Sequence, residues 1–443
     1  MTPGTGGLPP AGTPASESHD LVIVGGGIGG IICLKYALDA GLDALLLERA
    51  EGIGGLWRTL PAWQDIQIRK EDWTLGDLPI AGEDQPSILH NIQAWAERFD
   101  LAPGIRLGAN VRRARPRNGG WRVSTDDADY DATWLIAATG AHNRPVIPEV
   151  ERIDSTIVEH HSSDLHDPEA LRHRRVTVVG GGASAYDLLD LCFRHDADSV
   201  TWVYRNTRWM RPTRRAKYFG TNVRTFAKQQ MLGVSVDEMN RVVNEDLRAR
   251  YARAGITGIM PDADFDFRHE QLIPGRPRMI ENFERIRRHR GEVVSLRGDR
   301  VVLSTGERPE TDLLLWGTGY TMDLGYLDIE PLAGARRPTD AARRCYSGFL
   351  STDADNLFLL APAVLESNTS TPWAYAHVAK SIMSHIRGRP VFVDPPRAEL
   401  TNHIDLVKAF APRDRKSYWP LLWRLKYLWL ALYHPREKPL PLP

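Results

Sequence analysis

The feature that most constrains the fold is an apolar strand running into a glycine cluster, and it occurs twice. The first copy reads LVIVGGGIGG at residues 21–30, and the second reads RVTVVGGGASA at 175–185. A helical apolar pattern follows each cluster, so the glycines fall in a turn between strand and helix. Such a turn presents backbone N–H groups to a phosphate at the helix N-terminus. Two copies predict an α/β chain with two dinucleotide-binding domains.

Composition limits the partners of this chain. Its 443 residues suffice for two or three domains, and its 56 basic and 56 acidic residues balance, which argues against nucleic acid and favours a small-molecule partner. The three cysteines form no C-x-x-C pair, so we expect neither a dithiol centre nor a disulfide framework, and a cytoplasmic location fits. Residues 1–18 lack the pattern of a signal peptide, so we expect a disordered Gly/Pro/Ser tail. No metal site is expected.

Each glycine of the first turn has an expected task. Gly25 permits the tight turn, Gly27 lets a pyrophosphate approach the backbone, and Gly30 lets the helix pack on the strand. The next strand ends in Glu48, 23 positions after Gly25. That spacing is close to the roughly 20 positions typical of the acid that accepts hydrogen bonds from the ribose hydroxyls. The alternative, a packing turn with a solvated glutamate, does not account for strand, helix and acid in register.

The second turn has the pattern G-x-G-x-x-A. Its candidate coenzyme contacts are Gly180, Gly182, Ser184 and Ala185. The strand after it ends in Arg205 instead of an acid, and Arg208 follows. A guanidinium at this position pairs with the 2′-phosphate of NADPH, whereas a glutamate favours NADH. The alternative is a solvated basic loop.

The segment after Glu48 indicates which dinucleotide the first site binds. ERAEGIGGLWR at residues 48–58 resembles the FAD motif of the class B flavin-containing monooxygenase family, an acid followed by G-G-x-W. The resemblance implies FAD at the first site, with Gly55, Leu56 and Trp57 as further contacts. Two glycines let the backbone pass close to the flavin, and the tryptophan supplies a flat wall. The alternative for Trp57 is a core position beside a glycine turn.

Two further stretches resemble the segments where the family's chain crosses between its nucleotide domains. They are LIAATGAHNRPVIP at residues 135–148 and DLLLWGTGY at 312–320. The resemblance adds four candidate cofactor contacts: Thr139, Gly140, Thr318 and Gly319.

The fold implied is two Rossmann-like domains with the NADPH domain inserted into the FAD domain. The predicted parts are an FAD domain at 19–155 and 310–400, an NADPH domain at 156–309, and an extension at 401–443. Residues 417–438 of the extension are strongly apolar but too short for a span of ~20 residues. We expect them to be buried in the fold or in a homo-oligomer interface. A peripheral membrane anchor is the open alternative.

The chain departs from the family at two places. When the fingerprint F-x-G-x-x-x-H is anchored on His161, Ser155 and Ile157 stand at its Phe and Gly positions. The Baeyer-Villiger branch, which has its own version of this motif, therefore gains no support. Gln67 stands where the family carries an asparagine near the flavin, which makes it the catalytic candidate. A surface glutamine is the alternative.

Taken together, the resemblance implies a monooxygenase that uses NADPH, FAD and O2 and forms a C4a-(hydro)peroxyflavin. We expect a small organic substrate that is oxygenated at nitrogen or sulfur. Three alternatives remain open. The first is Baeyer-Villiger oxygenation of a carbonyl. The second is an NADPH-FAD reductase or dehydrogenase that does not hold a peroxyflavin. The third is a non-catalytic flavin-binding scaffold, which the second turn and Arg205 argue against.

Overall fold

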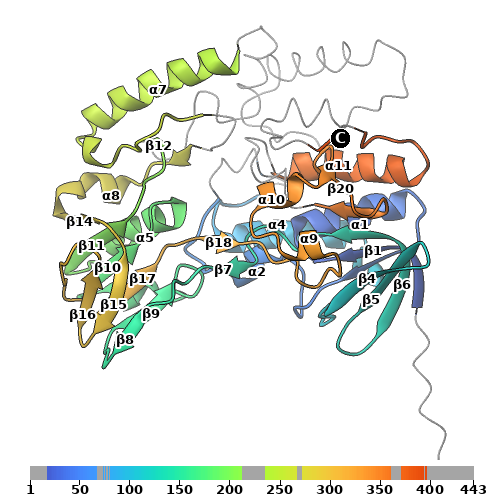
Figure 1. Ribbon diagram of the computed structural model, residues 1–443, viewed down its shortest axis with the longest axis horizontal. Coiled ribbons are helices and arrows are strands. Elements are labelled where there is room, and N and C mark those ends of the chain that lie inside the picture. Colours follow the sequence, from blue (N-terminus) through green and yellow to red (C-terminus); the bar gives the residue numbers. More distant parts are fainter. Residues whose placement is uncertain are drawn as a thin grey trace, which may run out of the picture.

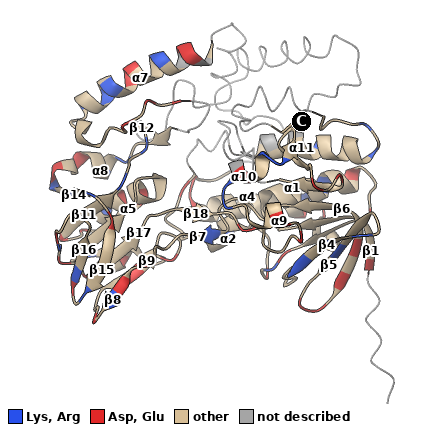
Figure 2. Ribbon diagram, viewed as in Figure 1, with Lys and Arg blue, Asp and Glu red and all other residues tan. Residues whose placement is uncertain are grey.

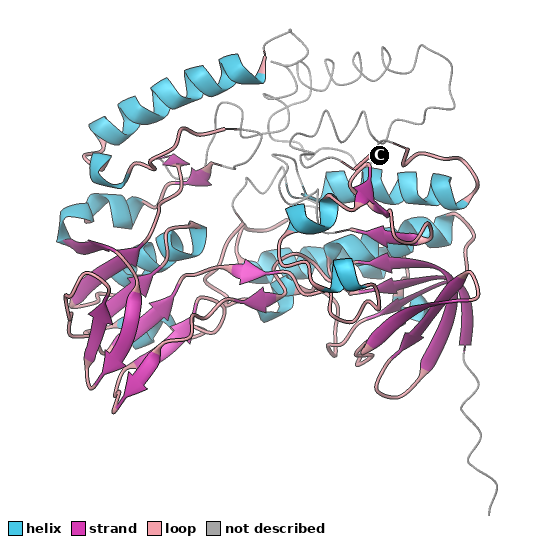
Figure 3. Ribbon diagram, viewed as in Figure 1, coloured by secondary structure: helices cyan, strands magenta, loops and turns pink. Residues whose placement is uncertain are grey.

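The chain folds into two α/β parts that lie side by side and are joined by short strands, and each part contains both helices and strands (Figure 1 and Figure 3). The computed structural model describes residues 17–66, 73, 75, 78, 80–211, 235–266, 272–360, 371–393 and 395–396. Among the described helices, none combines the length and the apolar character needed to cross a membrane.

The first part is built on a mixed sheet. Its main strand order is β19 (Cys345–Tyr346), β20 (Leu350–Ser351), β21 (Leu357–Leu359), β6 (Asp129–Ala137), β1 (Glu17–Val24), β2 (Ala44–Leu47) and β3 (Ile105–Arg106). The antiparallel strands β4 (Arg113–Arg117) and β5 (Gly120–Ser124) extend from β6. Its helices are α1 (Ile28–Asp39), α2 (Leu56–Thr59), α4 (Gln85–Arg98), α9 (Glu330–Ala333), α10 (Pro338–Ala342) and α11 (Thr371–Ile386).

Strand β1 is apolar throughout its second half because both faces of the sheet are covered. Leu21 and Ile23 pack into a core shared with α1, α4 and α11, whereas Val22 and Val24 pack into the core on the opposite face. This alternation places the carboxyl end of β1 at the glycine turn. Figure 1 shows α1 and α11 together over one face of the sheet.

The second part contains a five-stranded parallel sheet. Its order is β14 (Ile286–Arg290), β11 (Ser199–Tyr204), β10 (Arg175–Val179), β17 (Leu313–Trp316) and β9 (Val158–His161). Its helices are α5 (Ala183–Arg194), α7 (Val236–Arg253) and α8 (Pro277–Glu281). Smaller sheets pair β8 (Glu151–Ile153) and β16 (Arg300–Leu303) with β15 (Val293–Arg297), and β12 (Met210–Arg211) with β13 (Ile273–Pro274).

Helix α7 carries its charges where the helix dipole favours them. Ser235 caps its first turn by accepting a hydrogen bond from the Glu238 N–H at 3.1 Å. Acidic residues occupy the first turn and arginines the last, which stabilises the partial charges of the helix ends. Figure 2 shows both signs of charge spread along α7 and no large single-sign region on it.

The chain crosses between the two parts twice, and the crossings are bound together. Strands β7 (Arg144–Pro145) and β18 (Tyr320–Thr321) pair antiparallel between the two sheets (Figure 1). The Asn143 side chain donates to the Asp323 carbonyl at 3.1 Å and accepts from the Asp323 N–H at 2.9 Å. The two crossing segments predicted from the sequence therefore lie side by side.

The crossings correct the predicted domain limits at 155 and 310. Strand β8 pairs with β15 of the second part, and β17 lies between β10 and β9 in the second sheet. The first crossing thus precedes β8, and the second follows β17. The limits were wrong because a short apolar strand such as β17 does not itself indicate which sheet it joins.

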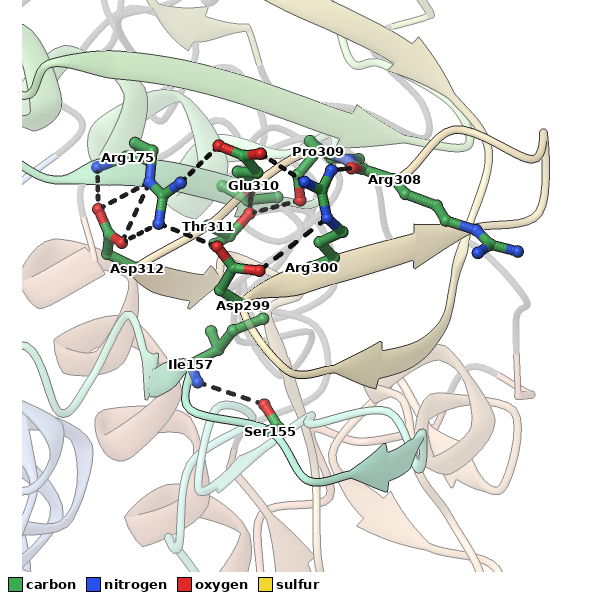
Figure 4. Close-up of polar contacts among 11 residues, drawn as sticks. Ser155, Ile157, Arg175, Asp299, Arg300, Arg308, Pro309, Glu310, Thr311 and Asp312 are labelled. Carbon is green, nitrogen blue, oxygen red and sulfur yellow. Dashed lines mark hydrogen bonds and ion pairs between the residues drawn. The ribbon is translucent and has the colours of Figure 1, made fainter.

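A network of ion pairs connects residues at the amino ends of β10 and β17 (Figure 4). The Arg175 guanidinium contacts Asp312 at 2.6 Å, Glu310 at 2.6 Å and Asp299 at 3.3 Å. Arg300 contacts Glu310 at 2.5 Å. Because Asp299 and Arg300 belong to the β15–β16 hairpin, the network joins that hairpin to the parallel sheet at the edge opposite the glycine turn.

Candidate functional site

The first glycine turn joins β1 to α1, and two of its glycines are required by the protein itself. Gly25 has a φ of 113°, and a Cβ on it would lie 2.5 Å from the Ala138 carbonyl oxygen. A Cβ on Gly30 would lie 1.9 Å from the Gly25 carbonyl oxygen. A side chain at Gly25 would push the turn away from the segment that follows β6, and one at Gly30 would push α1 away from the turn, which agrees with the tight turn and close packing that the pattern predicts.

Gly27 is different because the protein has room for a side chain there. It caps α1 with a φ of −74°, and among the described residues its added Cβ would meet only the Gly55 Cα, at an ordinary 3.7 Å. A glycine here places no side chain of its own beside the N-terminal N–H groups of α1. This open approach fits a pyrophosphate.

Glu48 is 7% exposed, and its carboxylate is held against the turn. Oε2 accepts a hydrogen bond from the Gly26 N–H at 2.5 Å, and Oε1 accepts one from the Ala50 N–H at 2.8 Å. Each carboxylate oxygen has a second lone pair, so the group keeps acceptor capacity for the hydroxyls of a ribose. The two backbone donors also fix its orientation before a ligand arrives.

The G-G-x-W segment packs directly on the first turn. The Gly54 N–H donates to the Gly26 carbonyl at 2.9 Å. Gly55 has a φ of 56°, and its added Cβ would lie 2.8 Å from the Gly27 Cα. Leu56 and Trp57 then form the short helix α2, where Trp57 is half-buried and meets the Trp73 ring edge to face at 5.6 Å. Both halves of the predicted FAD motif therefore lie together.

The second turn, like the first, has one glycine at which a side chain would clash with the protein and one at which the protein leaves room. Gly180 has a φ of 131°, with the Gly317 carbonyl oxygen 2.2 Å from its added Cβ. Ala185 is fully buried in the helix-packing position. Gly182 caps α5 with a φ of −111°, and its added Cβ would meet no atom of the described residues within 4 Å. Ser184 is half-buried in the first turn of α5. The open space at Gly182 fits a second pyrophosphate.

The loop with the predicted phosphate ligands lies against the second turn. The Arg208 N–H donates to the Gly181 carbonyl at 3.0 Å, and the Tyr186 hydroxyl donates to the Arg208 carbonyl at 2.8 Å. Arg205 follows β11 directly and is 76% exposed, with Glu292 at 3.3 Å from its guanidinium. The structure thus brings Arg205 and Arg208 to the side of the turn predicted for NADPH.

Of the four candidates on the crossings, Thr318 and Gly319 form hydrogen bonds within the protein. The Thr318 hydroxyl donates to the Val146 carbonyl, and the Val146 N–H donates to the Gly319 carbonyl at 2.9 Å. Gly140 has a φ of 79°, which a glycine adopts easily. Thr139 follows the residue whose carbonyl lies against Gly25, so it borders the first turn. These residues fix the chain path beside the two nucleotide sites.

His161, for which the sequence left a linker role and a functional role equally open, is buried at the second crossing. Its Nε2 lies 3.1 Å from the Gly319 carbonyl, and its Nδ1 lies 3.2 Å from the Ser163 N–H. A carbonyl only accepts, so Nε2 carries the proton of the neutral ring and Nδ1 accepts. Burial lowers the pKa of His161, which favours this neutral form. The Tyr320 ring packs edge to face on His161 at 5.0 Å.

The segment after the FAD motif contacts the second part of the molecule. The Trp63 indole N–H donates to the Leu165 carbonyl at 2.6 Å, and the Gln64 amide donates to the Ser162 carbonyl at 3.3 Å. Neither contact was predicted, because each joins residues about a hundred positions apart. They position the chain just before Gln67. Gln67 itself and residues 417–438 lie outside the described residues.

A buried charge, also missed from the sequence, lies at the same junction. Arg276 is 5% exposed and forms an ion pair with Asp187 of α5, with 2.5 Å between Nε and Oδ1. Desolvation raises the pKa of the Asp187 carboxyl, and Arg276 acts in the opposite direction. The carboxylates of Asp65 and Asp190 also act electrostatically on Arg276. Because Asp65 belongs to the first part, this guanidinium lies where the two parts meet.

Known proteins with similar sequences include enzymes named as monooxygenases. Flavin-containing monooxygenase 5 of Cavia porcellus is 24% identical over 347 residues, which cover 70% of this chain and 63% of the relative. Probable indole-3-pyruvate monooxygenase YUCCA1 of Arabidopsis thaliana is 32% identical over 204 residues, covering 43% of this chain and 48% of the relative. The chain therefore spans less than two thirds of the length of these relatives.

Solved structures with the same fold include a steroid monooxygenase bound to NADP and a cyclohexanone monooxygenase from Rhodococcus sp. Phi1 bound to NADP+. The first has a TM-score of 0.65 at 19% identity, and the second has 0.66 at 18%. Each match covers 84% of this chain and 85% of the other. The predicted α/β fold with two dinucleotide-binding domains is confirmed, as is the resemblance to class B flavin monooxygenases.

The family assignment rests on the sequence of both nucleotide-binding turns. Residues 22–248 match the family model described as pyridine nucleotide-disulphide oxidoreductase, and this range includes both glycine turns, Glu48 and Arg205. With the fold and the two open phosphate approaches in agreement, the chain belongs to the pyridine nucleotide-disulphide oxidoreductase family.

Proposed function

We propose that this protein is an FAD- and NADPH-dependent monooxygenase that transfers one oxygen atom from O2 to a small organic substrate. The observation that carries the proposal is the pair of open phosphate approaches at Gly27 and Gly182, one on each sheet of a two-part molecule. The monooxygenase names of the relatives support it, as do neighbours solved with FAD and NADP.

The first site suits FAD. The N-terminus of α1 would bind the pyrophosphate, and Glu48 would accept hydrogen bonds from the ribose hydroxyls. Trp57, half-buried beside the turn, would pack its indole ring against one side of the flavin ring. When bound, FAD supplies the chemistry, because it accepts a hydride from NADPH and activates O2. The chain contributes position and exclusion of water.

The second site suits NADPH. The N-terminus of α5 would bind the pyrophosphate beside Gly182, and Arg205 with Arg208 would hold the 2′-phosphate. The two crossings, joined through Asn143 and Asp323, set how the second site faces the first. Hydride transfer requires this arrangement because the two rings must come into contact.

Disulfide chemistry, which the family name includes, is not part of the proposal. Cys33, Cys192 and Cys345 are all buried and unpaired as free thiols. Burial raises the pKa of each thiol well above its usual range, so none is a good thiolate nucleophile.

We propose nitrogen or sulfur as the oxygen acceptor. A lone pair on either atom attacks an electrophilic oxygen without a cationic group to assist. A dimethylaniline monooxygenase 2 of Macaca mulatta, which is named as N-oxide-forming, supports this choice. It is 30% identical over 200 residues, covering 38% of this chain and 36% of the relative. The replacement of the fingerprint residues by Ser155 and Ile157 is consistent with it.

A second candidate, oxygenation beside a carbonyl, is favoured by Arg276. Attack on a carbonyl carbon needs an anionic oxygen donor, and a fixed cation stabilises such an anion. Arg276 supplies a buried guanidinium where the two parts meet, close to Asp187 and within electrostatic reach of Asp65. A carboxylate partner keeps that cation in place but also offsets part of its charge.

The test is a screen of the purified protein with a tertiary amine, a sulfide and a cyclic ketone. NADPH oxidation, O2 uptake, hydrogen peroxide and product mass are measured together. We expect the amine or the sulfide to gain one oxygen atom per NADPH. Conversion of the ketone to an ester, abolished in Arg276→Met, would favour the second candidate. NADPH oxidation that yields only hydrogen peroxide with every substrate would contradict both and indicate a reductase.

A further inference from the structure

We propose that Arg290 is a second determinant of coenzyme specificity, which binds the 2′-phosphate of NADPH together with Arg205. We further propose that Glu292 and Asp262 compete with this phosphate for the two guanidinium groups. The inference rests on the proposed NADPH site and adds residues that lie far from the glycine turn in the sequence.

The two arginines emerge at the same edge of the sheet. Strands β11 and β14 are parallel neighbours, and Tyr204 is in register with Arg290. Arg290 is the last residue of β14 and Arg205 is the first residue after β11, so both arginines lie at the carboxyl ends of adjacent strands. A dinucleotide binds along this edge of a parallel sheet.

The Arg290 side chain lies across the segment that carries Arg205. Its Nε donates to the Arg205 carbonyl at 3.0 Å, and one terminal nitrogen donates to the Asn206 side-chain oxygen at 3.2 Å. The Asn206 carbonyl in turn lies only 1.7 Å from where a Cβ on Gly181 would stand. Arg290 therefore contacts Asn206, and Asn206 lies against Gly181 in the turn that would bind the pyrophosphate.

Each guanidinium has an exposed carboxylate partner. Arg290 pairs with Asp262, and their side chains are 57% and 69% exposed. Arg205 pairs with Glu292 at 3.3 Å, and those side chains are 76% and 61% exposed. Ion pairs in water are weak, whereas a phosphate monoester carries about two negative charges. A 2′-phosphate can therefore displace both carboxylates, at a cost in affinity.

Other arginines of β14 are placed differently. Arg288 stacks on the Phe283 ring at 4.1 Å and donates to the Phe283 carbonyl, so its charge is directed toward the start of the strand. Arg287 is exposed and in register with Thr201 in the middle of β11. It lies three positions before Arg290, or about 10 Å along the strand. Arg287 is a matched control with the same charge on the same strand.

The experiment measures binding of two adenosine fragments to the full chain by calorimetry. Adenosine 2′,5′-bisphosphate carries the additional phosphate, and adenosine 5′-monophosphate lacks it. We expect Arg290→Gln to weaken binding of the bisphosphate about tenfold, by loss of a charge-assisted hydrogen bond, and to leave the monophosphate unchanged. Arg287→Gln should alter neither. Glu292→Gln and Asp262→Asn should each tighten bisphosphate binding, by up to about fivefold.

The outcomes separate this inference from the proposed function. If the unmodified protein binds the two fragments equally, the proposed NADPH site itself is wrong. If it prefers the bisphosphate and Arg290→Gln keeps the full preference, only the role of Arg290 is wrong. Should Arg290→Gln fail to fold, the Glu292 and Asp262 variants decide. Unchanged bisphosphate affinity in both would overturn the inference.

Discussion

Replacing Gly182 by alanine should separate coenzyme binding from folding. Among the residues that the structure describes, none has an atom within 4 Å of the added methyl group, and alanine accepts the backbone angles of −111° and −167°. The reduced entropy of the unfolded chain stabilises by about 0.4–1 kcal/mol, and a weaker helix cap offsets this by a few tenths. The free energy of unfolding should therefore change by less than about 0.5 kcal/mol.

Coenzyme binding should change much more. The methyl group occupies the space through which a pyrophosphate reaches the α5 N–H groups, and losing one charge-assisted hydrogen bond costs about 1.5–3 kcal/mol. The dissociation constant for NADP+ should rise roughly ten- to a hundredfold. Calorimetric titration with NADP+ measures this, and thermal unfolding without coenzyme should give a midpoint within about 2 °C of the parent.

A control at the neighbouring position tests the reasoning itself. A Cβ on Gly181 would stand 1.7 Å from the Asn206 carbonyl oxygen, so Gly181→Ala must displace backbone and should lower stability by about 1–3 kcal/mol. If Gly182→Ala binds NADP+ as tightly as the parent, no phosphate lies beside Gly182 and the assignment of the second turn is refuted.

Three other predictions concern different parts of the molecule. Glu48→Arg should abolish the yellow colour of the purified protein, because it replaces the ribose acceptor by a cation, while the exposed control Glu51→Arg should retain it; flavin absorbance measures both. Gln67→Ala should leave flavin reduction by NADPH intact but release more hydrogen peroxide, and unchanged coupling would show that the position is idle. Arg175 holds the pKa of Asp312 below its usual range, so this pair stabilises the fold above about pH 4 and the contribution disappears as the pH falls through the lowered pKa. Arg175→Gln should therefore lower the free energy of unfolding at pH 7 and lower it less at pH 3 in denaturant unfolding, and an equal loss at both pH values would argue against the pairing.

Features that depend on neighbouring residues were predictable from the sequence. The glycine turns, the position of Glu48 after β2 and the position of Arg205 after β11 follow from strand and helix periodicity and from spacing over about 25 residues. In the structure Glu48 lies against the first turn, and Arg205 directly follows β11. Periodicity also distinguishes a buried strand such as β1 from a surface strand.

Features that depend on pairing between distant segments were not predictable. Arg290 contacts Arg205 only because β14 pairs with β11, and no local sequence pattern predicts that these two strands pair in this register. Arg276 is one arginine among many in the sequence until α5 brings Asp187 to it. His161 looked ordinary because its partner, Gly319, lies 158 positions away. In each case the sequence supplies the chemical group, and the tertiary fold supplies its partner.

The central claim is that one oxygen atom from O2 enters an organic substrate at the expense of NADPH. The most direct measurement supplies heavy-isotope O2 to the purified protein with NADPH and the amine or sulfide that most stimulates coenzyme oxidation. We expect a product that carries one labelled oxygen atom for each NADPH consumed, with little hydrogen peroxide. NADPH oxidation matched by hydrogen peroxide, with no label in any product, would contradict it.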